Sequence, residues 1–105
     1  MHRSLLVSVF FLAFFNIFAS AALHSAALCV NYMNSAVVIN AAATEKACGF
    51  YSVRNKGPEQ WNTCSECKTK MINKLLTCLS PNWHIGGDEM EYYCKLSGAQ
   101  GALAN

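Results

Sequence analysis

The chain has 105 residues, of which 53% are hydrophobic, and its formal net charge is +2. This length leaves room for one small domain. Nucleic-acid and anionic-membrane binding are expected to use a basic run or patch, so a charge this weak predicts neither.

The first 21 residues have the layout of a secretory signal peptide. Arg3 gives a basic start, residues 5–18 form an almost unbroken apolar run, and Ala19 and Ala21 form an Ala-x-Ala site. The alternative is a membrane anchor, but the run is shorter than the roughly 20 residues that a spanning helix needs. We predict a leader of residues 1–21, an exported domain of residues 22–105, and no stable membrane insertion after cleavage.

Six cysteines follow the predicted leader: Cys29, Cys48, Cys64, Cys67, Cys78 and Cys94. Small exported domains compensate for a small core with disulfides, so we predict three bridges. The sequence alone does not choose among the possible pairings. One bridge is expected between Cys48 and Cys94, because each lies on the buried stripe of a predicted helix.

The Cys64-Ser65-Glu66-Cys67 motif has the spacing of a zinc half-site or a redox dithiol. A zinc site needs a second ligand pair, and Cys78, His84 and Cys94 are irregularly spaced for one. A redox motif opens a helix after a strand, which the preceding residues do not predict. We therefore expect structural disulfides in which Cys64 and Cys67 reach different partners, with no metal and no cofactor.

The first half of the domain is expected to mix short strands with one helix. Residues 22–27 look like a loose arm, and residues 28–32 and 37–39 have the composition of short strands. Thr44 is the expected N-cap of a helix that carries Ala47, Cys48 and Tyr51 on one face. That helix should end near Arg54.

The second half begins with a short helix expected from Pro58. Residues 71–79 fit either a helical face or a buried strand, and residues 80–82 form a turn. Asp88 and Glu91 match a capping box for a last helix.

The last helix is expected to bury Met90, Tyr93 and Cys94 and to end at Gly98, with a mobile tail over residues 99–105. The predicted fold class is α+β: a small, disulfide-rich single domain with two or three short helices and a few short strands.

Three acids, Asp88, Glu89 and Glu91, follow closely after His84. A helix N-terminus, whose dipole stabilises anions, accounts for all three. The alternative is an acid/base set in which His84 acts with Arg54 and one of the glutamates, as in a small secreted ribonuclease. Nothing in the spacing selects that trio, so we predict no catalytic residue and no enzyme.

Aromatic side chains are the other candidates for function. Four of them are expected in the core or at its rim: Trp61, Trp83, Tyr92 and Tyr93. If Trp83 is exposed beside Gly86 and Gly87, it is the first choice for a contact residue, together with His84, because aromatics carry interface energy.

Several short motifs span the predicted domain: Leu28-Cys29-Val30, Ala43-Thr44-x-x-Ala47-Cys48, Tyr51-x-x-Arg54-Asn55-x-Gly57, Trp61-x-x-Cys64-x-x-Cys67, His84-Ile85-Gly86-Gly87-Asp88-Glu89, Tyr92-Tyr93-Cys94 and Gly98-Ala99. Together they resemble the small secreted cysteine-rich proteins of plant-associated filamentous fungi, many of them candidate virulence effectors. The resemblance implies an extracellular, host-facing role, usually without enzymatic activity, and carries over no catalytic residue.

The leading hypothesis is a monomeric effector that binds a host protein or another extracellular host component, in the apoplast or at the host–fungus interface. One rival is a miniature secreted hydrolase or ribonuclease that uses His84. The other is a toxin or protease inhibitor that presents residues 80–87 as a protruding loop.

Overall fold

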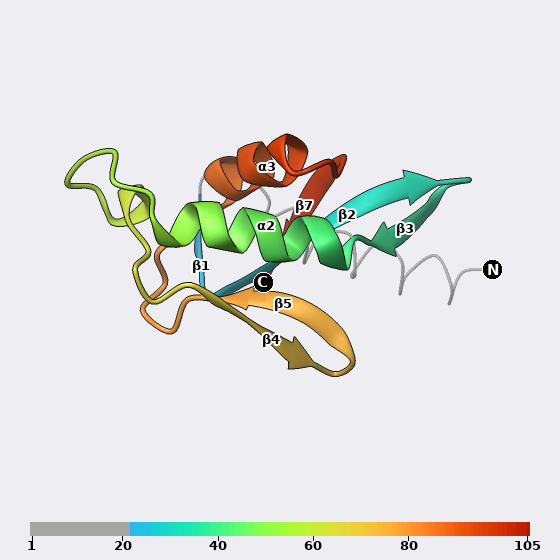
Figure 1. The fold of residues 1–105 in the computed structure, drawn as a ribbon, viewed down its shortest axis with the longest axis horizontal. Coiled ribbons are helices and arrows are strands. Elements are labelled where there is room, and N and C mark those ends of the chain that lie inside the picture. The colour runs from blue at the N-terminus through green and yellow to red at the C-terminus, as the bar shows by residue number, and fades with distance from the viewer. Residues whose placement is uncertain (1–21) are drawn as a thin grey trace, which may run out of the picture.

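The long strand β2 (Ala26–Met33) organises the domain in the computed structural model, which describes residues 22–105. One edge of β2 pairs with β5 (Leu75–Leu79) near its start and with β3 (Ala36–Ile39) near its end. Its other edge pairs with β7 (Gly101–Ala104), while β4 (Lys68–Ile72) extends the sheet beyond β5. All these pairings are antiparallel, and Figure 1 shows the two hairpins diverging.

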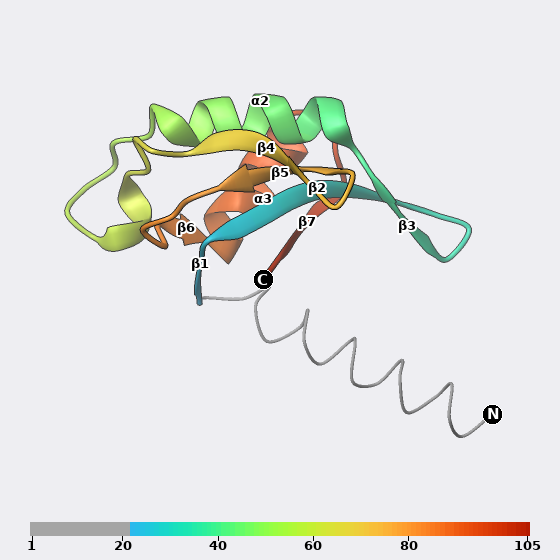
Figure 2. The same ribbon diagram turned by 90° about the horizontal axis from the view of Figure 1, so that it is seen from below.

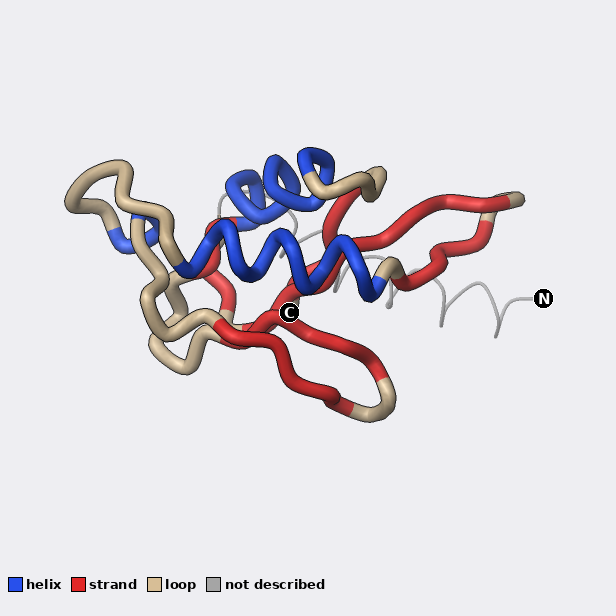
Figure 3. The backbone as a smooth tube through the Cα atoms, in the orientation of Figure 1, coloured by secondary structure: helices blue, strands red, loops and turns tan. Residues whose placement is uncertain are grey.

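Two helices complete the predicted α+β fold, which is confirmed. They are α2 (Ala41–Ser52) and α3 (Gly87–Leu96), and Figure 2 shows α2 lying along one side of the strands. A two-stranded sheet joins β1 (Leu23–His24) to β6 (Ile85–Gly86). The long connection after α2, at the left of Figure 3, contains only the short 3-10 helix η1 (Gln60–Asn62) where a helix from Pro58 was expected.

Disulfides fix both helices to the same face of the sheet. Cys29 of β2 is bonded to Cys94 of α3, and Cys48 of α2 is bonded to Cys78 of β5. Because Cys78 lies opposite Ala27 in the β2–β5 register, Cys29 and Cys78 point to one side. The three predicted bridges are confirmed, but the expected link between Cys48 and Cys94 is wrong.

The N-terminus of α2 closes a gap in the pairing of β2. Neither β3 nor β5 pairs with β2 at Cys29, so the helix supplies the hydrogen-bond partners of this residue on that edge. The Cys29 amide donates to Thr44 Oγ1 at 2.8 Å, and its carbonyl accepts from the Asn40 amide at 2.9 Å. Asn40 is also the N-cap, accepting from the Ala43 amide at 3.0 Å. The prediction of Thr44 as cap is therefore wrong, because this buried threonine serves the strand.

The second helix keeps its predicted stripe but not its predicted cap. Met90, Tyr93 and Cys94 are buried, and Glu91 and Lys95 form the expected ion pair at 2.8 Å. Gly86 is the N-cap and makes no side-chain cap bond, so the capping box is wrong. Gly98 has a φ of +101°, which glycine adopts readily, just beyond the end of the helix.

The chain ends of the described region are paired, so the expected loose arm and mobile tail are both wrong. Residues 22–27 enter β1 and β2, and His24 is fully buried. Burial lowers the pKa of His24, against the effect of a hydrogen bond with the Asn105 backbone. Residues 101–104 form β7, and Asn105 Oδ1 accepts from the Ala26 amide at 3.2 Å.

Residues 71–79, which the sequence left between helix and strand, belong to the β4–β5 hairpin. Its two-residue turn, Asn73 and Lys74, has φ values of 50° and 68°, as a type I′ turn requires. Asn34 and Ser35 form the same kind of turn between β2 and β3, with φ values of 51° and 68°. The strands predicted over residues 28–32 and 37–39 and the turn at residues 80–82 are confirmed. The predicted leader, residues 1–21, lies outside the described residues.

Candidate functional site

Arg54 and Glu89, two members of the hypothetical acid/base trio, line one surface groove of about 560 Å³. The Arg54 guanidinium is held by neutral groups. It donates to the Tyr93 hydroxyl at 3.0 Å and to Asn62 Oδ1 at 3.3 Å. It also lies 5.7 Å from the ring centres of Tyr51 and Tyr93, within cation–π range. The groove thus brings together a cation and a carboxylate.

His84, the third member of the trio, does not line that groove. Its ring Nδ1 lies 2.7 Å from the Gln60 carbonyl oxygen, and its amide donates to Ser80 Oγ at 2.8 Å. The carboxylate near His84 is Glu66, which accepts from Ser80 Oγ at 2.6 Å. Burial acts to raise the pKa of Glu66, yet the Ser80 hydrogen bond and the nearby His84 lower it overall. The trio predicted from the sequence is therefore not assembled at one place.

Tyr51 anchors the end of the loop of residues 80–87, which contains the predicted contact residues Trp83 and His84. Its buried hydroxyl donates to the Trp61 carbonyl at 2.7 Å, accepts from the Gly86 amide at 2.9 Å, and lies 3.2 Å from the His84 carbonyl oxygen. Burial raises the pKa of this phenol to about 12. Since Ile85 and Gly86 are buried in β6, residues 80–87 do not protrude as a whole.

Trp83 lies in the exposed part of that loop, together with Pro81 and Asn82. Its side chain is 46% exposed, its φ is +61°, and its carbonyl accepts from Gln60 Nε2 at 2.8 Å. His84 beside it is half-buried. Of the other aromatic residues expected in the core or at its rim, Tyr93 is buried and Trp61 half-buried, whereas Tyr92 is 60% exposed. The loop offers one exposed aromatic on a backbone held by hydrogen bonds.

Cys64 and Cys67 are bonded to each other, so the expectation that they reach different partners is wrong. Within residues 22–105 every cysteine is in a disulfide, and no group of three or more His, Cys, Asp or Glu side chains could hold a metal. The bridge closes the turn that precedes β4.

The face of the sheet opposite the helices is apolar. Side chains alternate along a strand and cross-strand partners share a face, so the register assigns each residue to one side. The following residues share the side of Leu28: Ala26, Val30, Tyr32, Val37, Ile39, Ile72, Leu75, Thr77, Leu79 and Leu103. In this set Tyr32, Val37, Ile72 and Leu75 are 52%, 51%, 39% and 41% exposed, whereas Leu28, Val30 and Thr77 are buried. We call this surface the open face, because neither α2 nor α3 covers it.

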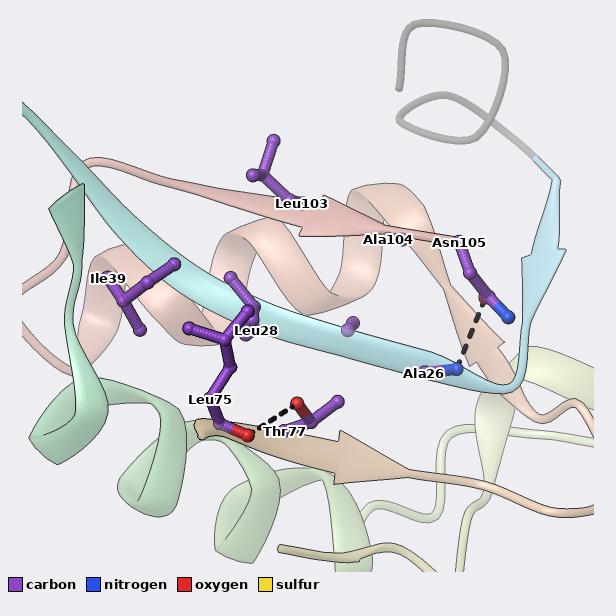
Figure 4. Close-up of a pocket in the computed structure, with 9 residues that line it drawn as sticks. Ala26, Leu28, Ile39, Leu75, Thr77, Leu103, Ala104 and Asn105 are labelled. Atoms are coloured by element: carbon purple, nitrogen blue, oxygen red, sulfur yellow. Dashed lines mark hydrogen bonds between the residues drawn. The ribbon is translucent and has the colours of Figure 1, made fainter. Parts of the chain in front are cut away.

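A shallow groove of about 190 Å³ lies in the open face (Figure 4). Figure 4 shows four leucine and isoleucine side chains that line it, Leu28 of β2, Ile39 of β3, Leu75 of β5 and Leu103 of β7, with Leu28 and Leu75 next to each other. The groove forms where β3 and β5 diverge along the same edge of β2.

The charges on the open face are all positive. Lys68 and Lys70 share this face, because they pair with Leu79 and Thr77, and both are exposed. Lys74 lies in the adjoining turn. The five strands of the described sheet contain no acidic residue.

The sequence did not predict the open face. It needs residues 26–27, 71–79 and 101–105 to be strands of one sheet, and those segments were expected to be an arm, an undecided element and a tail. The available signal was a short run in which apolar residues occupy both sets of alternating positions, as in a strand with two apolar faces. Residues 26–30 and 75–79 are such runs.

The fold and the three disulfides define a small, disulfide-braced α+β protein. The model of the biotrophy-associated secreted protein 4 family matches residues 22–102. The chain belongs to this family of secreted proteins of plant-associated fungi, and the resemblance inferred from the sequence is confirmed. No curated protein and no solved structure matches the chain. In the described part, neither helix has the length and hydrophobicity to cross a bilayer.

Proposed function

We propose that this protein is an extracellular effector that acts by binding a host molecule through the open face, without catalysing a reaction. Membership of a biotrophy-associated secreted family supports a role during colonisation of a host. The observation that carries the proposal is the open face itself. Contiguous apolar surface on a soluble protein marks an interaction site, whereas scattered apolar residues do not.

A rigid frame supports this function because a pre-ordered surface loses little conformational entropy on binding. Disulfides tie both helices to the strands that carry the open face. The groove between β3 and β5 provides a place for an anchor side chain of the partner, and such anchors dominate interface energies. Trp83 remains a second proposed contact, on the loop at the other end of the molecule from the hairpin turns (Figure 1).

The test compares variants secreted during host colonisation. Leu75→Glu places a charge in the open-face groove and should abolish the colonisation phenotype, since Leu75 lines the groove and is 41% exposed. The matched control is Leu96→Glu, the same change at an exposed position of the Arg54 groove. It should leave the phenotype intact, as should His84→Ala, while Trp83→Ala should give a partial loss.

Two outcomes would contradict the proposal, provided that circular dichroism shows every variant to be folded. Full activity of Leu75→Glu would remove the open face from function. Loss of activity in His84→Ala alone would revive the enzyme hypothesis.

A further inference from the structure

We propose that the occupant of the open face is an amphipathic α-helix of a host protein whose apolar stripe is flanked by acidic residues. This inference rests on the proposed function and specifies its partner. Antiparallel sheets with one uncovered face normally present polar residues there. Here the alternation places mainly apolar side chains on the uncovered side of β2, β3, β5 and β7, while β4 contributes Ile72 and two lysines. A sheet of this kind requires a covering layer, and a helix is a common one.

The size of the groove favours a protein side chain over a small ligand. Pockets that enclose small molecules usually measure roughly 300–1,000 Å³. The groove of about 190 Å³ is smaller and shallow, and it continues into exposed Leu75, Ile72 and Val37 around it. A small hollow inside a broad apolar surface suits an anchor residue on a larger apolar stripe.

The hydrogen bonding of β2 favours a helix over an added strand. An extended peptide would need unpaired amides and carbonyls at the groove. The one interruption in the pairing of that edge is at Cys29, and α2 fills it. The Cys29 amide donates to Thr44 Oγ1 and its carbonyl accepts from the Asn40 amide. Along this edge of β2 the groove therefore offers side chains and no free backbone groups, which favours a helix.

The charges specify the flanks of the helix. Lys68 and Lys70 stand on the open face along β4, and Lys74 lies in the turn at its end. None of them takes part in an ion pair within residues 22–105, where the recorded pair is Glu91–Lys95. Acidic flanks would be attracted to these three lysines and basic flanks would be repelled. The lysines would therefore select the partner by charge.

The test uses two synthetic helical peptides of about 18 residues, five turns of helix. Both carry the same leucine stripe, and they differ only in having glutamate or lysine on its flanks. Binding to the oxidised, secreted protein is measured by fluorescence anisotropy. The glutamate peptide should bind at least about tenfold more tightly than the lysine peptide, an effect that should shrink as salt is raised.

Three variants locate the binding. Leu75→Glu should abolish binding of the glutamate peptide, and the matched Leu96→Glu should not change it. The double variant Lys68→Glu and Lys70→Glu reverses the charge at two of the three lysine positions, and it should bind the lysine peptide more tightly than the glutamate peptide. This charge swap is the most discriminating variant, because both side chains are exposed and neither belongs to the ion pair Glu91–Lys95.

Several results would overturn the inference. They are equal binding of the two peptides, binding that survives Leu75→Glu, a dimer in light scattering that Leu75→Glu dissociates, and Leu75-dependent binding to vesicles of phosphatidylserine and phosphatidylcholine. If one of these occurs while Leu75→Glu still abolishes the colonisation phenotype, the helix is wrong and the binding function stands. If Leu75→Glu leaves the phenotype intact, the proposed function itself fails.

Discussion

The two faces of the central sheet are both apolar, but they are built from side chains of different size. The helix-covered face carries small residues where β2 meets β7, namely Ala27, Cys29, Ala102 and Ala104. The open face carries Leu28 and Leu103 at the equivalent positions. Small residues allow the helices to approach the strands closely, and the bridges to them span Cα–Cα distances of 5.3 and 5.5 Å.

This difference separates stability from recognition. A domain of this size has a small core, and here disulfides between helix and strand supplement it. Where β2 meets β7, the larger apolar side chains, Leu28 and Leu103, lie on the surface that no helix covers. Changes on the covered face should therefore alter the free energy of unfolding, and changes on the open face should alter binding.

Removing the disulfides of the covered face should have the largest effect on stability. In the chain-entropy account the stabilisation grows with the length of the closed loop, and Cys29–Cys94 spans 65 residues whereas Cys64–Cys67 spans 3. Replacing both members of the pair by alanine should lower the free energy of unfolding by about 4 kcal/mol for Cys29–Cys94 and about 2 kcal/mol for Cys64–Cys67. Urea unfolding measures both.

The pair Cys64–Cys67 is the matched control, because it removes one bridge without detaching a helix. Equal losses for the two double variants would show that the covered face does not depend on its long-range bridge.

Tyr51→Phe removes the buried Tyr51 hydroxyl and should have an intermediate effect on the free energy of unfolding. The phenylalanine leaves the Gly86 amide and the Trp61 carbonyl without their hydroxyl partner. Leaving buried groups unsatisfied should lower the free energy of unfolding by about 2 kcal/mol. Thermal unfolding at neutral pH measures this loss.

The pH dependence gives the control for Tyr51. Burial raises the pKa of its phenol from 10 to about 12, so the folded state holds this proton more tightly than the unfolded state. The contribution is fully present below pH 10 and is lost as the pH rises towards 12. Tyr51→Phe should remove this part of the alkaline loss, and an unchanged alkaline profile would contradict the assignment.

Local patterns allowed some of these features to be predicted and hid others. The stripe of Met90, Tyr93 and Cys94 repeats at helical spacing and was found, as was the number of bridges. The pairing of Cys29 with Cys94 was not, because it depends on β2 lying under α3, a contact between distant segments. Thr44 has the right chemistry for a cap, yet burial against Cys29 gave it another role.

The candidate site was harder to predict than the fold. His84, Arg54 and Glu89 were selected by residue type, and only two of them share a groove. The open face consists mainly of ordinary aliphatic residues, and only the strand register shows that they share one surface. The pairing of residues 101–104 with β2 is the most important part of that register. Short apolar segments do not reveal their strand partners, so this surface required the structure.

The smallest effect on stability is expected from Val37→Thr on the open face. Val37 is 51% exposed and lies opposite Tyr32 in the β2–β3 hairpin. Threonine keeps the branched shape that strands favour and places a hydroxyl where water already reaches, so the free energy of unfolding should change by less than about 0.5 kcal/mol. Urea unfolding of the secreted protein provides the measurement, and binding of the glutamate-flanked peptide should weaken in the same variant. A loss above about 1 kcal/mol would place Val37 against packed protein even without a partner. That result would remove the distinction between the two faces on which the binding function rests.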